Sequence, residues 1–162
     1  MSALARADLW LLRRARAAAR PPVSDAVHRF SMLGEHAAVW LALGALGALV
    51  DRPRRGRWAR GALVVGATYA ANTAIKALVR RRRPVLEDLP PLVGTPTGLS
   101  FPSAHSSTSF AAARAYGALV PAAPLYAAAA AMACSRVYLG VHYPSDVAGG
   151  ALLGLAMGSA AR

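Results

Sequence analysis

The sequence has 162 residues, of which 56% are hydrophobic, yet its formal net charge is +12. The length suits one domain, and the charge raises the question of nucleic-acid binding. Long runs of Ala, Leu, Val and Gly alternate with bursts of arginine, which is the segregation that a bilayer imposes. The polar surface left over is too small for a basic groove, so we expect membrane lipids as partners and no nucleic acid. The single cysteine, Cys134, lies inside an apolar run and excludes a disulfide framework and a Cys-based metal site.

The N-terminal segment is predicted to form a basic amphipathic helix. Residues 3–20 mix leucines and a tryptophan with arginines. Such a helix is too charged to cross a bilayer but suits the membrane interface, where arginines meet anionic lipid heads. A frayed basic tail is the alternative interpretation. Pro21 and Pro22 are expected to end this helix, and a short second helix is expected over residues 24–33.

Five apolar segments that follow are candidates for membrane-spanning helices. They cover residues 36–50, 61–79, 104–120, 122–138 and 144–160. The first is short for a hydrocarbon core of ~30 Å, so we expect it to begin near Phe30 or Ser31. A basic loop is expected over residues 51–60. We predict an all-α, multi-pass membrane helix bundle with about five transmembrane helices and an N-terminal interfacial amphipathic helix. Residues 1–35 would form the interfacial part and residues 36–162 the transmembrane core.

Three clusters of polar residues lie at the ends of these apolar segments. They are residues 76–84, 101–107 and 135–146. If the chain crosses the bilayer alternately, the second segment ends on the side where the third begins, and the fourth ends where the fifth begins. All three clusters then share one membrane face and are predicted to form one site. Basic residues flank both faces, so the positive-inside rule leaves the orientation open.

The second cluster has the features of an anion-binding helix start. Ser103, Ala104 and His105 open the third apolar segment, and the free N–H groups and dipole of a helix N-terminus favour an anion. Ser103 could donate to a phosphate oxygen, although a serine at this place usually only caps its helix. His105 is costly in a membrane helix unless it has a partner, so it is a candidate for function.

The third cluster pairs a histidine with a carboxylate. Asp146 follows His142 by four residues and could accept one ring N–H, which leaves the other ring nitrogen free to attack. Arg136 adds a cation upstream. The plainer interpretation is a surface histidine beside an aspartate that stabilises a helix N-terminus.

The first cluster supplies further positive charge. Phosphoryl transfer needs cations that hold and neutralise the equatorial oxygens, and Lys76 and Arg83 are suited to this. The intervening run of residues 80–82 could equally be an interfacial run that meets lipid phosphates.

The spacing of these clusters resembles a known signature. It reads Lys76, six residues, Arg83-Pro84; then Pro-Ser-x-His; then Ser-Arg136, five residues, His142, three residues, Asp146. This resembles the type-2 phosphatidic acid phosphatase family, which shares its site with vanadium haloperoxidases. One departure is Ala104, where that family usually has glycine. Its backbone N–H is kept, so activity is expected to survive.

The resemblance implies a role for each site residue. His142 would be the nucleophile that forms a phospho-histidine, Asp146 would orient it, and His105 would protonate the leaving alkoxide and later activate water. The phosphate would be bound by Lys76, Arg83, Ser103, the N–H of Ala104, and Arg136. The family uses no metal or other cofactor, and the sequence shows no cluster typical of a metal site.

Within this family, the chain resembles the actinobacterial enzymes that remove a phosphate from polyprenyl-linked phosphoribose. The resemblance lies in the small size, in Gly34–His36 and in residues 94–107. It implies a lipid-phosphate substrate in a bacterial plasma membrane, in the route to cell-wall arabinan. Glu35 and His36 could contact the sugar, or they could simply be interfacial residues at a helix end.

Other functions stay open from the sequence. An undecaprenyl-diphosphate, phosphatidylglycerol-phosphate or phosphatidic acid phosphatase would carry the same catalytic residues. A non-enzymatic basic membrane protein that binds anionic lipid or a partner would explain the arginine bursts, but not the two histidines and the aspartate on one face. The sequence makes no prediction of the oligomeric state.

Overall fold

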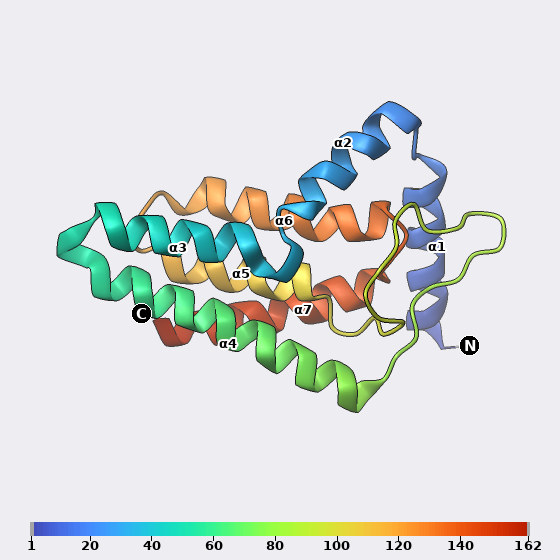
Figure 1. Cartoon of the computed structure of the whole chain (residues 1–162). Coiled ribbons are helices and arrows are strands. Elements are labelled where there is room, and N and C mark those ends of the chain that lie inside the picture. The colour runs from blue at the N-terminus through green and yellow to red at the C-terminus, as the bar shows by residue number, and fades with distance from the viewer. Residues whose placement is uncertain (1, 162) are drawn as a thin grey trace.

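The computed structural model describes residues 2–161, and every regular element in that range is helical (Figure 1). The helices are α1 (Ala3–Ala17), α2 (Pro21–Met32), α3 (Ala38–Val50), α4 (Arg55–Val79), α5 (Ala104–Tyr116), α6 (Ala122–Tyr138) and α7 (Pro144–Gly158), with 3₁₀ turns η1 (Glu35–Ala37), η2 (Arg52–Arg54) and η3 (Ser159–Ala161). The predicted all-α class is therefore confirmed.

Helix α5 is the centre of the bundle. It contacts α4, α6 and α7, and α3 packs on α4 (Figure 1). Glycines in α7 allow its close approach to α5: a Cβ added at Gly154 would collide with the carbonyl oxygen of Ser107, and one at Gly150 would lie 2.6 Å from the carbonyl oxygen of Ser103. Small residues at such contacts let helix backbones pack tightly where no hydrophobic effect drives them together.

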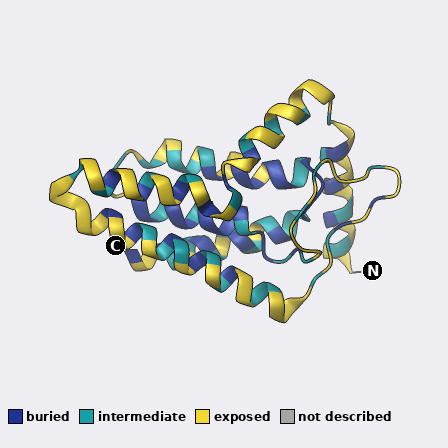
Figure 2. Cartoon of the chain, in the orientation of Figure 1, coloured by how far each residue is buried: buried dark blue, intermediate teal, exposed yellow. Residues whose placement is uncertain are grey.

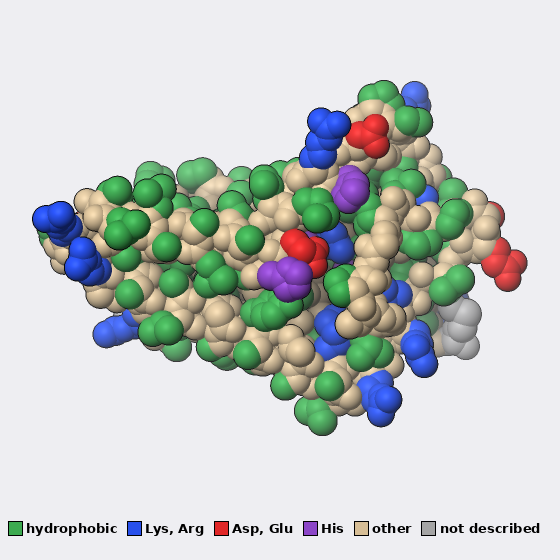
Figure 3. Space-filling model, in the orientation of Figure 1, with side chains coloured by type: hydrophobic (Ala, Val, Ile, Leu, Met, Phe, Trp, Pro, Cys, Tyr) green, Lys and Arg blue, Asp and Glu red, His purple; other side chains and the backbone are tan. Residues whose placement is uncertain are grey.

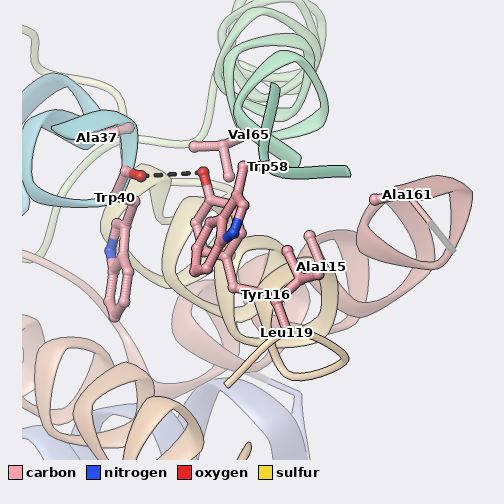
Figure 4. Packing of buried hydrophobic residues seen from close by; sticks show 9 residues of the cluster. Ala37, Trp40, Trp58, Val65, Ala115, Tyr116, Leu119 and Ala161 are labelled. Carbon is pink, nitrogen blue, oxygen red and sulfur yellow. Dashed lines mark hydrogen bonds between the residues drawn. The ribbon is translucent and has the colours of Figure 1, made fainter. Parts of the chain in front are cut away.

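Aromatic residues fill the core at the end of the bundle away from the polar clusters. The ring centroids of Trp58 and Tyr116 are 5.3 Å apart, and the Tyr116 hydroxyl donates to the carbonyl oxygen of Trp40 across 3.0 Å (Figure 4). The Trp40 indole N–H donates to Ser109 Oγ at 2.8 Å. Each polar tip thus has a partner, as buried Tyr and Trp require.

Large apolar side chains are exposed on the outside of the bundle. Leu46, Leu63 and Leu152 are 57%, 73% and 69% exposed on α3, α4 and α7, and the outward faces of these helices are largely exposed (Figure 2). The buried residues of α5 are polar in its first turns, from His105 to Ser109, and are alanines and Tyr116 further along. Exposed apolar surface of this extent marks contact with lipid or a partner.

Length and hydropathy alone identify few spanning helices among the described residues. The continuous segment Arg52–Val79 is long and apolar enough, and the pair Pro21–Met32 and Glu35–Val50 passes only together, with a bend of 45°. The predicted first segment is thus part of a bent pair. The bend falls where His36 and Ala37 adopt left-handed backbone angles, with φ of 50° and 61°, so α3 cannot continue α2.

Two predicted boundaries were wrong. Pro21 does not merely follow the first helix but begins α2, because proline lacks an N–H that the first turn would leave unpaired and its φ suits a helix. The expected basic loop over residues 51–60 is mostly helical, since η2 and the first turns of α4 run through it.

Candidate active site

The three polar clusters meet at one end of the bundle, around a pocket of ≈ 150 Å³. Eight of the ten predicted site residues line it, namely Glu35, His36, Lys76, Arg83, Ala104, His105, Arg136 and His142. The other two, Ser103 and Asp146, are fully buried behind the pocket wall. The predicted convergence of the clusters is therefore what the fold shows.

His142 lies in the turn between α6 and α7 and is 2% exposed. Its Nε2 is 3.1 Å from Nη1 of Arg83, and its Nδ1 is 3.5 Å from Oδ2 of Asp146. The second distance is longer than a well-formed hydrogen bond, and such contacts often tighten only when substrate binds. Burial lowers the pKa of His142 to about 3; the Asp146 contact opposes this shift, and the charges of Arg83 and Arg136 add to it.

Asp146 is held by the start of its own helix. Pro144 occupies the first helical position, and Asp146 Oδ2 accepts from the backbone N–H of Tyr143 at 2.8 Å, which closes a capping box. The other oxygen, Oδ1, accepts from Nη1 of Arg81 at 2.7 Å. Both oxygens are thus held in place. Oδ2, the oxygen nearer to His142, is held by the backbone N–H of Tyr143.

His105, in the first turn of α5, has the partner that its position demands. Its Nε2 lies 3.1 Å from the carbonyl oxygen of Ser31, at the end of α2, and 3.7 Å from Oε2 of Glu35. The ring is also packed against the break between α2 and α3, because a Cβ added at Gly34 would lie 2.8 Å from its Cδ2. The bent helix pair therefore shapes one wall of the site.

Three cations surround the pocket, and their hydrogen-bond acceptors within residues 2–161 are neutral. Lys76 Nζ donates to the carbonyl oxygens of residues 99, 100 and 102 at 3.0 to 3.3 Å. Arg83 donates to the carbonyl oxygen of Val141 at 2.8 Å. Arg136 Nη1 donates to Ser31 Oγ at 2.6 Å. Because these acceptors carry no full charge, the cations keep their charge available for an anion.

Ser103 occupies the N-cap position of α5, but its side chain does not cap the helix. Its hydroxyl makes no capping bond to α5, and among the described residues Oγ is buried with no partner. The backbone N–H of Ser103 donates to the carbonyl oxygen of Asp146 at 3.0 Å, which ties α5 to α7. The capping position is thus confirmed without the capping bond, and the unpaired hydroxyl stands beside Ala104, which lines the pocket.

Several residues at the site were not predicted from the sequence. Ser31 is fully buried and contacts both Arg136 and His105, but no pattern distinguishes it in a short helix. Arg81 bonds Asp146 and is hidden in a run of four arginines. Asp8 accepts a hydrogen bond from Arg81 at 2.8 Å. The sequence indicates it only as the single acidic residue of a basic helix. Asn72 is fully buried and donates to the carbonyl oxygen of Pro102 at 3.2 Å.

Over residues 2–161, no group of three or more His, Cys, Asp and Glu side chains is arranged to hold a metal ion. The charged groups of the pocket are instead cations that suit phosphate oxygens, beside two histidines and a carboxylate. This set can bind a phosphoryl group, attack it with an imidazole nitrogen and supply a proton to the leaving group.

A model of the PAP2 superfamily matches residues 57–162. The chain belongs to this superfamily. This PAP2 protein is therefore an enzyme, a phosphatase of the type-2 phosphatidic acid phosphatase family, and the family assignment from the sequence is confirmed.

Two relatives of this PAP2 protein carry the same name, decaprenylphosphoryl-5-phosphoribose phosphatase. The protein of Mycolicibacterium smegmatis is 46% identical over 139 residues, which are 82% of this chain and 74% of that protein. The protein of Mycobacterium tuberculosis is 43% identical over 148 residues, which are 86% of this chain and 79% of that protein.

Two solved structures share the fold at 26% identity. The transmembrane PAP2-type phosphatidylglycerolphosphate phosphatase of Bacillus subtilis gives a TM-score of 0.80 and covers 99% of this chain and 85% of its own. LpxE of Aquifex aeolicus gives 0.81 and covers 94% of this chain and 93% of its own. This protein is accordingly a membrane phosphatase that acts on a lipid phosphate.

Proposed function

We propose that this protein removes the 5-phosphate of the ribose from decaprenylphosphoryl-5-phosphoribose, in the route to cell-wall arabinan. Identity of 46% and 43% to the two phosphatases that bear this substrate's name supports the assignment. The pocket also suits the substrate's chemistry, because it places cations for a phosphate beside polar side chains for a sugar.

In the proposed first step, the phosphate enters between the cations and displaces Arg83 from His142. Its oxygens bind the side chains of Lys76, Arg83, Ser103 and Arg136 and the backbone N–H of Ala104. Nε2 of His142 attacks the phosphorus in line with the ribose oxygen, so an N–P bond forms as the O–P bond breaks. The ribose oxygen takes a proton from His105. Asp146 stabilises the charge that develops on the His142 ring.

In the second step, water hydrolyses the phospho-histidine. His105, now neutral, takes a proton from the water, whose oxygen forms the new bond to phosphorus as the N–P bond breaks. Inorganic phosphate leaves and His142 is restored. Glu35, whose Oε2 lies 3.7 Å from Nε2 of His105, is proposed to favour the protonated form of His105 when the phosphate is bound.

Glu35 and His36 are proposed to contact the ribose. Both line the pocket, and Tyr69 and Thr97 add hydroxyl groups to its lining. The left-handed backbone of His36, with φ of 50°, turns its side chain out of the helix register, and its ring lies 6.0 Å from that of Tyr69. A non-glycine residue in this conformation costs about 1–3 kcal/mol and is common at functional sites.

The proposed setting is the bacterial plasma membrane, with the chain crossing it about five times. Helices α3, α4, α5, α6 and α7 would be the spans. Residues 1–35 would form the interfacial part and residues 36–162 the core. Exposed leucines on the bundle exterior support this, as do the basic side chains gathered at both ends of the molecule with apolar ones between them (Figure 3).

A phosphatidylglycerol-phosphate phosphatase is the second candidate. The fold of the Bacillus subtilis enzyme matches 99% of this chain, and the cation set would serve either phosphomonoester. His36 would then have no ribose to bind, so its loss would leave turnover unchanged.

The test is release of inorganic phosphate by detergent-purified protein in EDTA. The panel holds decaprenylphosphoryl-5-phosphoribose, undecaprenyl diphosphate, phosphatidylglycerol phosphate and phosphatidic acid. His142→Ala should abolish release, whereas His28→Ala, a histidine outside the active-site pocket, should retain it. Preference for another lipid would keep the mechanism and reject the substrate, and release by His142→Ala at the normal rate would reject both.

A further inference from the structure

The N-terminal helix places a buried carboxylate against the active site. Asp8 lies in the middle of α1 and is 2% exposed. Figure 1 shows α1 lying across the end of the bundle, and it contacts α6 and α7. An isolated buried carboxylate is costly unless it is paired and hydrogen-bonded. The partners of Asp8 therefore indicate why it is there.

Each partner of Asp8 belongs to the surroundings of Asp146. Oδ1 accepts from the backbone N–H of Ser145 at 2.9 Å. Oδ2 accepts from Nη2 of Arg81 at 2.8 Å and from the hydroxyl of Ser145. Burial alone would raise the pKa of the Asp8 carboxyl, but the bonds from Ser145 and Arg81 outweigh it and hold the pKa below its usual value. Asp8 is thus ionised at neutral pH.

Arg81 connects the two carboxylates. Its Nη1 donates to Asp146 Oδ1 at 2.7 Å while Nη2 donates to Asp8. Its guanidinium lies 4.1 Å from the centre of the Tyr143 ring, which supports its plane. A planar fork held at both ends has one orientation. Because its charge is shared with Asp8, Asp146 keeps more of its own charge for the His142 ring.

We propose that Asp8 and Arg81 are positioning residues for the phosphatase reaction: Asp8 fixes Arg81 and the first turn of α7, and these fix Asp146 behind His142. The inference rests on the proposed role of His142. Of the residues in this arrangement, Asp8 alone lies outside the family match, which begins at residue 57.

Asp88 offers a matched control. Its Oδ2 accepts from Nη1 of Arg13 at 2.6 Å, so it also ties α1 to the rest of the chain through an arginine. Both side chains of that pair are more than half exposed, at 51% and 58%, and neither touches Asp146. If Asp8 only anchored α1, loss of either carboxylate would have a comparable, small effect on catalysis.

The experiment compares Asp8→Asn and Asp88→Asn in detergent-purified full-length protein. In single turnover on the phosphoribose lipid, Asp8→Asn is expected to slow phospho-histidine formation by about 10- to 100-fold, as loss of a carboxylate behind a ligating or reacting histidine does elsewhere. KM should change little. Asp88→Asn should stay within about 2-fold of the parent protein, because exposed ion pairs contribute little.

The decisive arm places Asp8→Asn in an Asp146→Asn background. If Asp8 acts through Asp146, the second substitution adds no further slowing. An equal slowing in both backgrounds would overturn the proposal, as would a normal rate for Asp8→Asn. Should Asp8→Asn fail to purify as a monodisperse protein, Ser145→Ala removes the hydroxyl that Asp8 and Arg81 share and is subject to the same test. Normal turnover by His142→Ala would instead reject the proposed function itself, so the two failures are distinguishable.

Discussion

Arg83 donates to His142: its Nη1 lies 3.1 Å from the Nε2 atom of the imidazole. A guanidinium has no acceptor, so Nε2 must carry the lone pair, and the ring proton of neutral His142 is on Nδ1, toward Asp146. This is the tautomer that attack by Nε2 requires. In the free enzyme Arg83 thus covers the nucleophile, and phosphate binding must draw the guanidinium onto phosphate oxygens.

Arg83→Lys should lower kcat/KM by about 100- to 1000-fold, the usual effect of losing a donor aimed at developing charge. Lysine keeps the charge but lacks the planar guanidinium that donates to the carbonyl oxygens of Thr97 and Val141 and to Nε2 of His142. Arg82→Lys, at an exposed position of the same run, is the matched control and should have little effect. Steady-state kinetics on the lipid substrate measures both, and equal rates for the two variants would contradict the assigned role of Arg83.

The stability of the protein should fall as the pH falls from about 6.5 to about 3. Burial lowers the pKa of His142 to about 3, below its ordinary 6.5. Between these values the unfolded chain binds a proton that the folded chain does not, so the contribution of neutral His142 is complete above pH 6.5 and is lost on acidification.

His142→Asn cannot titrate in that window, so the unfolding midpoint in detergent should fall less between pH 7.5 and 5 than that of the parent protein. For a chain of this size, each kcal/mol corresponds to about 2–4 °C. Parallel midpoints for the two proteins would contradict the lowered pKa.

The sequence predicted the helical class and the convergence of the three polar clusters because both depend on patterns that are local in the chain. Lys76 and Arg83 lie within one short stretch of the sequence, and so do Arg136 and Asp146, so their spacing can be read directly. If consecutive apolar helices cross the membrane alternately, the end of one lies on the same face as the start of the next. The convergence of the three polar clusters follows from this. The alternation of apolar and basic stretches did not predict the bend at His36 or the helical start of α4. Backbone angles at such positions depend on packing against other parts of the chain.

The supporting contacts escaped prediction for a different reason. Ser31 and Asp8 act on residues far along the chain: Ser31 bonds Arg136, and Asp8 bonds Ser145. Nothing in the neighbouring sequence identifies a serine whose hydroxyl will accept a hydrogen bond from a buried arginine. Arg81 lies in a run that is typical of lipid-facing charge, and its contacts with Asp146 and Asp8 distinguish it from its neighbours.

Gly34→Ala should slow catalysis by about 10- to 100-fold without preventing folding. The added Cβ would lie 2.7 Å from Sδ of Met132 and 2.8 Å from Cδ2 of His105. Met132 can adjust its flexible side chain, but the imidazole must shift, and small misplacements of a catalytic group are costly. Gly66→Ala, which meets nothing within 4 Å, should leave kcat unchanged. A rate for Gly34→Ala that equals the control would show that His105 does not need its present position.

Ser31→Ala should weaken phosphate binding. The substitution removes the hydroxyl that accepts from Arg136 Nη1 at 2.6 Å, and a hydrogen bond to a charged group contributes about 1.5–3 kcal/mol. The inhibition constant of inorganic phosphate should therefore rise about 10-fold or more. The contact to His105 uses the backbone carbonyl and is kept. Ser24→Ala, whose hydroxyl contacts Tyr138 rather than a residue of the pocket, is the control, and the same constant for both variants would count against a phosphate-binding role for Arg136.

Detection of the covalent intermediate tests the proposed mechanism most directly. Protein mixed with lipid labelled in the ribose phosphate, then quenched in alkali to preserve phospho-histidine, is digested and analysed by mass spectrometry. We predict one transient phosphoryl group, on His142, that forms at least as fast as turnover and is absent from His142→Ala. A phosphoryl group on another residue, or normal turnover with no labelled protein at any time, would contradict nucleophilic attack by His142.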